Sequence, residues 1–103
     1  VLVVDDVESN RDMIAGLLDS AGFRVDTACN GLQALEAVKQ VGYDLILMDI
    51  SMPVMDGVAA IKKIRELPGK ASVKAVAVTA SVSHEARERL LIQGFDEYIG
   101  KPL

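Results

Sequence analysis

Cysteine, tryptophan and long apolar runs are almost or wholly missing from this sequence, which contains one cysteine and no tryptophan. The single cysteine, Cys29, cannot close an internal disulfide, which favours a reducing compartment, and we expect the cytoplasm. The longest apolar stretches, such as residues 1–4 and 45–48, are much shorter than the roughly 20 residues of a membrane-spanning helix. We therefore expect no membrane contact by this domain.

Basic residues are also scarce. The 103 residues include 11 Lys and Arg against 15 Asp and Glu, which gives a net charge of -4. With no basic run longer than Lys62-Lys63 and only two Phe and two Tyr, the sequence lacks the basic, aromatic surface typical of nucleic-acid binding. Half of the residues are apolar and are spread along the whole length, which predicts one folded domain over residues 1–103. Because the first residue is Val1 rather than Met, we expect a longer parent chain.

Short apolar runs alternate with segments of helical periodicity, which predicts an α/β fold. Three runs are continuously apolar, as in strands buried on both faces of a parallel sheet: residues 1–4, 45–48 and 75–78. Two mixed runs suit the sheet edges: residues 24–28 and 97–100. Four helices are predicted. Apolar residues at positions 13, 14, 17, 18 and 21 recur at helical spacing and mark the first, which stops at Gly22. The others cover residues 32–38, 57–66 and 84–93. Ser9 or Asn10 is the predicted N-cap of the first helix.

A central first strand and an edge second strand favour the flavodoxin-like, doubly wound parallel sheet with strand order 2-1-3-4-5. The sequence ends at Leu103, soon after the fifth predicted strand, so no fifth helix is left to cover the sheet face that the first helix shares. We expect that face to be partly uncovered, and we expect Leu91 and Ile92 to widen the apolar surface of the fourth helix. Either surface could bury itself against a second copy of the chain and form a dimer.

Polar residues follow four of the predicted strands: Asp5, Asp6, Asp49, Thr79 and Lys101. The carboxyl ends of parallel strands meet at one edge of the sheet, so we expect these side chains to converge there. Carboxylates about 4 to 6 Å apart would repel each other by a few kcal/mol per pair unless a cation lies between them or one of them is protonated. Oxygen ligands alone suit Mg2+ or Mn2+ better than Zn2+, and the one histidine, His84, is not predicted to lie near them.

These residues resemble the receiver domains of two-component phosphorelay signalling. The resemblance covers the chain except for a last helix and rests on five motifs: Asp5-Asp6, Asp49, Met52-Pro53-Val54-Met55-Asp56-Gly57, Thr79-Ala80 and Lys101-Pro102. It implies that Asp49 is the phosphoryl acceptor and that Asp6 and Asp49 bind Mg2+, with Asp5 and the backbone carbonyl of Ser51 assisting. We expect that Mn2+ can substitute for Mg2+.

The resemblance also assigns roles around the phosphoryl group. Thr79 and Lys101 would hold its oxygens, and Ala80 would leave access to it. Tyr98 stands three residues before Lys101, where the family has the aromatic residue of its switch, and would move inward together with Thr79 upon phosphorylation. The domain would then act as a self-phosphorylating and self-dephosphorylating phosphoacceptor rather than as an enzyme with a separate substrate.

The implied phosphodonor is a phosphohistidine on a histidine kinase core, and the implied acceptor is a histidine phosphotransfer domain or a downstream effector. Three runs look like receivers fused to sensor histidine kinases: residues 55–57, 77–80 and 94–98. We therefore favour a hybrid histidine kinase as the parent protein. A free-standing single-domain response regulator is the alternative.

Three other functions fit parts of the sequence. A phosphohydrolase with an Asp nucleophile would carry it after the first strand and would need a cap, for which 103 residues leave no room. A flavin-binding domain of the same winding would need a phosphate-binding loop where Asp5, Asp6 and Glu8 would repel phosphate. A degenerate receiver that acts only as a docking module would be expected to lack one of the acidic residues or the lysine.

Overall fold

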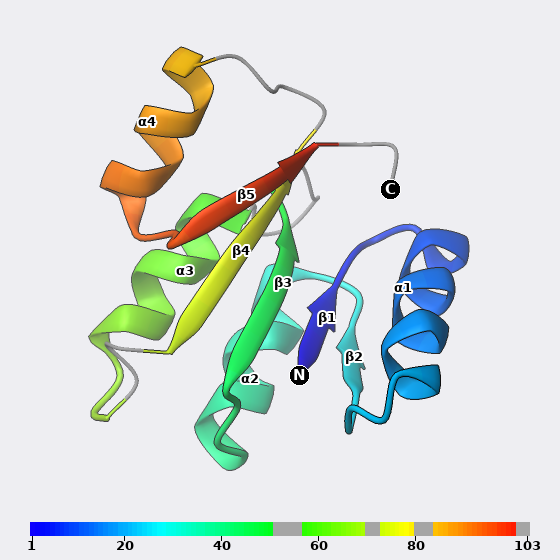
Figure 1. Ribbon diagram of the computed structural model, residues 1–103. Coiled ribbons are helices and arrows are strands. Elements are labelled where there is room, and N and C mark those ends of the chain that lie inside the picture. The colour runs from blue at the N-terminus through cyan, green and yellow to red at the C-terminus, as the bar shows by residue number, and fades with distance from the viewer. Residues whose placement is uncertain (51–56, 70–72, 80–83, 101–103) are drawn as a thin grey trace.

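The computed structural model describes residues 1–50, 57–69, 73–79 and 84–100. Within these ranges the chain forms a five-stranded, all-parallel sheet with strand order β2-β1-β3-β4-β5, which confirms the predicted fold (Figure 1). The strands are β1 (Leu2–Val4), β2 (Asp26–Ala28), β3 (Leu45–Asp49), β4 (Lys74–Thr79) and β5 (Glu97–Gly100). The helices are α1 (Glu8–Ser20), α2 (Gly31–Gln40), α3 (Gly57–Glu66) and α4 (His84–Gln93).

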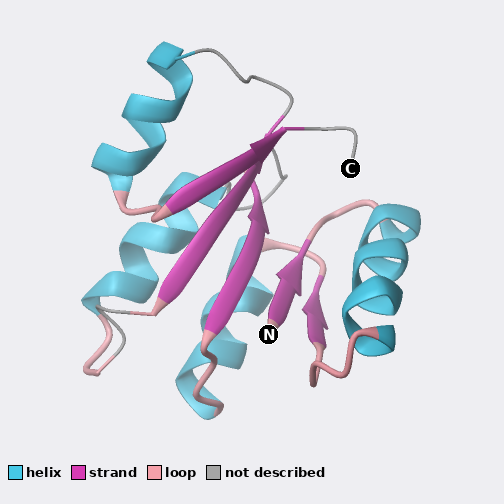
Figure 2. Cartoon of the chain, in the orientation of Figure 1, coloured by secondary structure: helices cyan, strands magenta, loops and turns pink. Residues whose placement is uncertain are grey.

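The pairing of β1 places the winding reversal at the centre of the sheet. Val4 is in register with Ala28 of β2 on one side and with Met48 of β3 on the other. All five strands point the same way, so their carboxyl ends share one edge (Figure 2). In open α/β sheets, ligands bind at this edge next to the reversal, here between β1 and β3.

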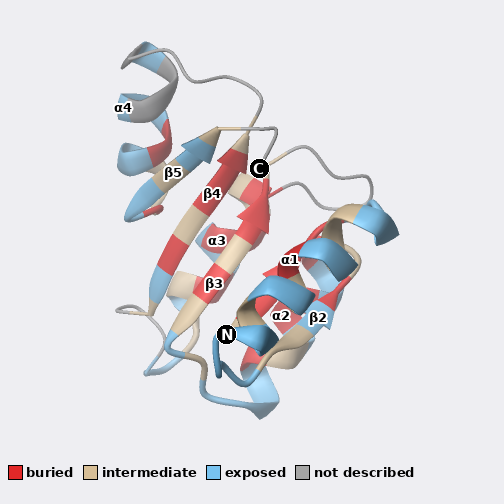
Figure 3. Ribbon diagram, turned by 45° about the vertical axis from the view of Figure 1, so that its right-hand side comes forward, coloured by how far each residue is buried: buried red, intermediate tan, exposed pale blue. Residues whose placement is uncertain are grey.

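The main core lies on the sheet face covered by α2, α3 and α4. The strands contribute side chains that are almost fully buried: Leu2, Val4, Ile46, Met48, Ala75 and Ala77. The helices contribute Ala34, Leu35, Val38, Ala60, Ile61, Ile64 and Leu90. Burying each large side chain of this kind stabilises the fold by about 1.5–3 kcal/mol relative to leaving it in water. The central strands that carry the loops at the carboxyl edge are therefore largely buried (Figure 3).

Among the described helices, α1 alone lies on the other face of the sheet (Figures 1 and 2). Val3 of β1 and Ile14 of α1 are buried there. Leu17 of α1 is 66% exposed, and Ile99 of β5 is also exposed. The described residues thus leave this face partly uncovered, as the sequence predicted.

The apolar surface of α4 also follows the prediction. Leu90 is buried in the core, whereas Leu91 is partly exposed and Ile92 is 85% exposed. None of the described helices has the length and apolarity that a membrane crossing requires.

The start of α1 differs from the prediction, because the helix begins at Glu8 with Val7 as N-cap, and neither Ser9 nor Asn10 caps it. The Asp5 carboxylate explains the early start. Its Oδ1 accepts a hydrogen bond from the Val7 N–H at 2.9 Å, which forms a tight turn directly after β1. The Val7 carbonyl then accepts the Arg11 N–H at 3.0 Å, so the helical hydrogen bonds begin two residues earlier than a Ser9 cap would allow.

Candidate functional site

Three carboxylates meet at the carboxyl edge of the sheet: those of Asp5, Asp6 and Asp49. One oxygen from each lies within 4.8 Å of the others. Asp5 and Asp49 are each only 2% exposed, whereas Asp6 is exposed. Asp5 and Asp6 follow β1 and Asp49 ends β3, so the pairing of these two strands brings the three residues together.

Asp5 is held in place by its backbone as well as by its side chain. Its N–H donates to the Ala28 carbonyl of β2 at 3.2 Å. Its Oδ1 accepts the Val7 N–H at 2.9 Å, and its carbonyl accepts Nη1 of Arg11 at 2.9 Å. These contacts fix the direction in which the loop after β1 leaves the sheet, and with it the position of Asp6.

Asp49 is the last residue of β3, in register with Val78 of β4. The next residue, Ile50, donates its N–H to the Val78 carbonyl at 3.1 Å and accepts the Gly57 N–H at 3.0 Å. A Cβ atom at Gly57 would lie 2.4 Å from the Asp49 carbonyl oxygen. Because no side chain fits in that space, only glycine lets α3 start this close to the acidic residue.

The charges of this site favour a hard divalent cation. Two unit negative charges 4.8 Å apart repel each other by about 3 kcal/mol at an effective dielectric of 20. A cation between the carboxylates would convert this repulsion into attraction. All three donors are carboxylate oxygens, which Mg2+ and Mn2+ prefer, and the donor set therefore fits either ion.

The remaining predicted site residues are distributed along the same edge. Thr79 ends β4, one residue beyond the register partner of Asp49. Tyr98 of β5 is in register with Ala77 and is partly buried against the core. Because side chains alternate along a strand, Tyr98 and Thr79 lie on the same face of the sheet. Three predicted residues lie outside the described ranges: Ser51, Ala80 and Lys101.

Comparison with known proteins places this arrangement in a family. The sequence model of the response regulator receiver domain matches residues 1–103. This chain belongs to the response regulator receiver domain family. The relatives of this receiver domain include hybrid histidine kinases, in agreement with the sequence resemblance.

Two relatives differ in how much of their length the receiver domain covers. The chain is 41% identical over 103 residues to the signal transduction histidine-protein kinase BarA of Escherichia coli strain K12, covering 100% of this chain and 11% of that kinase. It is 37% identical over 103 residues to an uncharacterized 14.6 kDa protein of Leptolyngbya boryana, covering 100% of this chain and 79% of that protein. The same fold family thus occurs in both long and short chains.

A solved structure supports the fold. The receiver domain of a sensor histidine kinase from Pseudomonas aeruginosa PAO1 was crystallised with a magnesium ion coordinated in its active site cleft. It matches this receiver domain with a TM-score of 0.90 and 36% identity, over 99% of this chain and 84% of that one.

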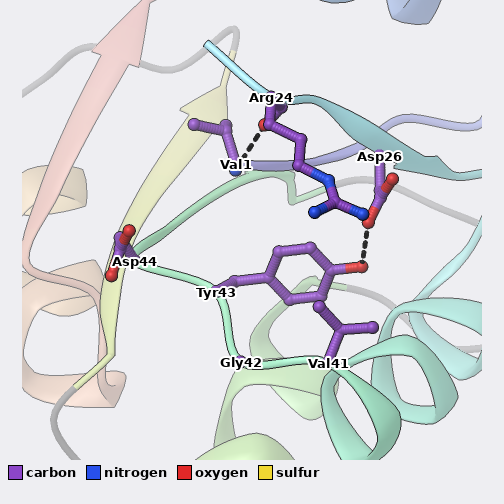
Figure 4. Close-up of a pocket in the computed structure, with 7 residues that line it drawn as sticks. All are labelled: Val1, Arg24, Asp26, Val41, Gly42, Tyr43 and Asp44. Carbon is purple, nitrogen blue, oxygen red and sulfur yellow. Dashed lines mark hydrogen bonds between the residues drawn. The ribbon is translucent and has the colours of Figure 1, made fainter.

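A pocket of about 150 Å³ lies at the opposite edge of the sheet (Figure 4). It is lined by Val1, Arg24, Asp26, Val41, Gly42, Tyr43 and Asp44. The Tyr43 hydroxyl donates to Oδ2 of Asp26 at 2.7 Å. Burial and then this carboxylate raise the pKa of Tyr43 to about 12. The pocket is at the amino ends of β2 and β3, so it is separate from the acidic site of the receiver domain.

Sequence reasoning missed two residues that shape the acidic site. Arg11 contacts the backbone of Asp5, and Gly57 allows the close approach of α3 to Asp49. Gly57 was visible only as part of a motif, because its role depends on the distance between the start of α3 and the end of β3. Arg11 had no signal of its own, since an arginine in the first turns of a helix usually faces solvent.

Proposed function

We propose that this receiver domain accepts a phosphoryl group on Asp49 from a phosphohistidine, in a reaction that depends on Mg2+ or Mn2+. The observation that carries the proposal is the convergence of the three carboxylates within 4.8 Å. Asp49 is the buried member that ends a central strand. Asp5 already uses Oδ1 to accept the Val7 N–H, which suits it to a supporting role.

Group transfer at this site is mainly a matter of position and charge. A carboxylate oxygen of Asp49 forms a bond to phosphorus while the P–N bond of the donor breaks, and the electron pair stays on the imidazole nitrogen. Asp5, Asp6 and Asp49 would hold the metal, with the Ser51 carbonyl as a further ligand by family resemblance. When bound, Mg2+ supplies positive charge next to the oxygens of the transferring group. The Thr79 hydroxyl and the Lys101 ammonium would donate hydrogen bonds to the same oxygens.

The product is an acyl phosphate on Asp49. Attack of water on its phosphorus releases phosphate and restores the carboxylate, so the domain undergoes a cycle of modification without acting on a separate substrate. Ala80, by family resemblance, leaves room for water or a second histidine to approach. We therefore classify the domain as a phosphoacceptor and not as an enzyme.

The proposed partners are a histidine kinase core as donor and a histidine phosphotransfer domain or a downstream effector as acceptor. A hybrid histidine kinase with this domain in the cytoplasm is the favoured parent protein, because hybrid kinases recur among the relatives. The match to a short chain, most of which is covered, supports a free-standing response regulator as the second candidate.

Phosphorylation would change the conformation of the domain through Thr79 and Tyr98. The two residues share one face of the sheet, and Tyr98 is partly buried, so an inward movement of its ring has a path along the end of β5. The exposed apolar side chains of α4 lie beside this strand and would change their surroundings. To convert a mostly inactive population into a mostly active one, phosphorylation must stabilise the active conformation relative to the inactive one by about 5.5 kcal/mol.

Intact-mass spectrometry tests the proposal. The protein is incubated with acetyl phosphate and Mg2+, beside an Asp49→Asn variant and a sample with EDTA. We expect one added phosphoryl group in the wild type with metal, and none in the two controls. Because rapid hydrolysis could remove the group, beryllofluoride binding is measured on the same samples. A folded wild-type protein that neither gains mass nor binds beryllofluoride would refute the phosphotransfer function. The remaining function would then be that of a degenerate receiver that acts only as a docking module.

A further inference from the structure

Arg11 lies in α1, outside the group of carboxylates, but its guanidinium reaches back to the loop that carries two of them. Its Nη1 donates a hydrogen bond of 2.9 Å to the main-chain carbonyl of Asp5, in a partly buried position. Its own N–H donates to the Val7 carbonyl at 3.0 Å. Arg11 therefore contacts the backbone on both sides of Asp6.

Three hydrogen bonds close this loop into a compact unit. The Asp5 carbonyl accepts the Arg11 guanidinium, the Val7 carbonyl accepts the Arg11 N–H, and the Asp5 carboxylate accepts the Val7 N–H. Asp6 lies between the two anchored residues, and its side chain is exposed. The hydrogen bonds of the two flanking residues therefore limit the positions that the Asp6 backbone can take.

We propose that Arg11 is a positioning residue for the divalent-cation site, and that it holds the loop after β1 so that Asp5 and Asp6 can bind Mg2+ together with Asp49. The inference rests on the proposed function, because it assumes that the three carboxylates hold a metal. Arg11 acts through the backbone of Asp5 and does not bind the metal itself. Outer-shell residues that hydrogen-bond to the ligating side chains themselves typically change metal affinity by 10- to 100-fold when they are replaced, and a contact through the backbone should fall near the lower end of that range.

The charge of Arg11 predicts an effect of the opposite sign. A guanidinium beside a cation site repels the incoming ion, so removing the charge alone would tighten Mg2+ binding. Removing the hydrogen bond to Asp5 would weaken it, because the loop would then sample conformations in which the carboxylates are apart. The direction of the change in affinity therefore separates the positioning role from a purely electrostatic one.

The test compares four variants by the dissociation constant for Mg2+ alone, measured from amide chemical shifts during a magnesium titration. Arg11→Met and Arg11→Gln remove the charge and the reach to the Asp5 carbonyl, and both residues are good helix formers. Arg11→Lys keeps the charge and one donor. Arg24→Met is the matched control, because it removes the same charge at the opposite edge of the sheet.

We expect Arg11→Met and Arg11→Gln to bind Mg2+ about tenfold more weakly than the wild type. Arg11→Lys should recover most of the loss, and Arg24→Met should bind like the wild type. In phosphorylation by acetyl phosphate, the Mg2+ concentration for half-maximal rate should rise in Arg11→Met and Arg11→Gln, while the rate at saturating Mg2+ stays close to that of the wild type. A purely structural role would not separate these two quantities.

Unchanged or tighter Mg2+ binding in a folded Arg11→Met or Arg11→Gln protein would overturn the positioning role. If one of the two variants does not fold, as judged by the dispersion of its amide signals, the other provides the same comparison. Wild-type protein that does not bind Mg2+ would overturn the proposed function as well. Wild-type binding with unaffected variants would overturn only the role of Arg11.

Discussion

Arg65 of α3 and Asp96, directly before β5, form an ion pair of 3.0 Å between Nη2 and Oδ2. Arg65 also donates to the main-chain carbonyls of Gly94 and Val73, and Oδ2 of Asp96 accepts the Ala75 N–H at 2.8 Å. The pair thus connects α3, the start of β4 and the turn that leads from α4 into β5. This connection lies at the end of β5 away from Asp49, so it anchors one end of the strand that carries Tyr98.

Arg65→Met should destabilise the protein by about 2–3 kcal/mol, because the substitution leaves several partly buried acceptors without their charged donor. The side chain of Arg65 is only 18% exposed, so water cannot fully replace it. Urea denaturation followed by circular dichroism measures the free energy of unfolding.

The matched control for this experiment is Lys39→Met. Lys39 pairs with Glu36 on α2 with 46% and 58% of the two side chains exposed, so its loss should cost less than about 0.5 kcal/mol. Equal effects of the two substitutions would show that the Arg65 connection contributes no more than a surface ion pair.

Gly57→Ala should lower stability by about 1–3 kcal/mol and reduce phosphorylation of Asp49. The added Cβ would be 2.4 Å from the Asp49 carbonyl oxygen and 2.9 Å from Cα of Ile50, so the backbone of these two residues must move. Urea denaturation and the mass assay measure the two effects.

Gly16→Ala makes the same chemical change in the exposed part of α1, where a Cβ would meet nothing within 4 Å. It should stabilise the protein by about 0.5–1 kcal/mol, because alanine favours the helix. A stable, normally phosphorylated Gly57→Ala protein would contradict the steric role of Gly57.

The sheet order was predictable because it depends on local patterns. The continuously apolar runs of β1, β3 and β4 identified the central strands, and the acidic residues after them followed from the rule that strand ends share an edge. The cap of α1 was predicted wrongly, because the Asp5 carboxylate turns the chain before Ser9 is reached. Contacts between distant residues, such as Arg65 with Asp96, had no pattern along the sequence to reveal them, since they depend on how the loops pack.

Tyr43 should ionise far above the ordinary value of 10, because burial and then the Asp26 carboxylate raise its pKa to about 12. Folding therefore favours the neutral hydroxyl. Its contribution to stability is complete below pH 10 and is lost as the pH rises from 10 to 12. The absorbance difference at 295 nm between wild type and Tyr43→Phe isolates this residue during an alkaline titration.

The same variant tests the hydrogen bond to Asp26. At neutral pH, Tyr43→Phe should be less stable by about 0.5–1 kcal/mol, since the site is only partly buried. That difference should shrink as the pH rises above 10. Circular dichroism at each pH shows whether the protein is folded, and a midpoint near 10 in folded protein would contradict the effect of the Asp26 carboxylate.

Without metal, Asp49→Asn should stabilise the protein by about 1–3 kcal/mol, because it removes one charge from three carboxylates whose oxygens lie within 4.8 Å of one another. With Mg2+ bound, the wild type should instead be more stable than Asp49→Asn. At a concentration one hundred times its dissociation constant, the ion adds about 2.7 kcal/mol to the wild type, and it should add much less to the variant, which has lost a charged ligand. Thermal unfolding of the wild type and of Asp49→Asn, each with EDTA and with Mg2+, measures the four stabilities.

Asp12→Asn controls for a general effect of charge, since Asp12 is an exposed residue of α1. It should change stability by no more than about 0.5 kcal/mol and leave the stabilisation by Mg2+ intact. The decisive result is that Asp49→Asn is more stable than the wild type in EDTA and less stable than the wild type in Mg2+. A structural defect in Asp49→Asn would instead lower its stability in both conditions. Equal stabilisation of wild type and Asp49→Asn by Mg2+ would mean that the ion binds elsewhere, and the carboxylate of Asp49 would then not be a ligand.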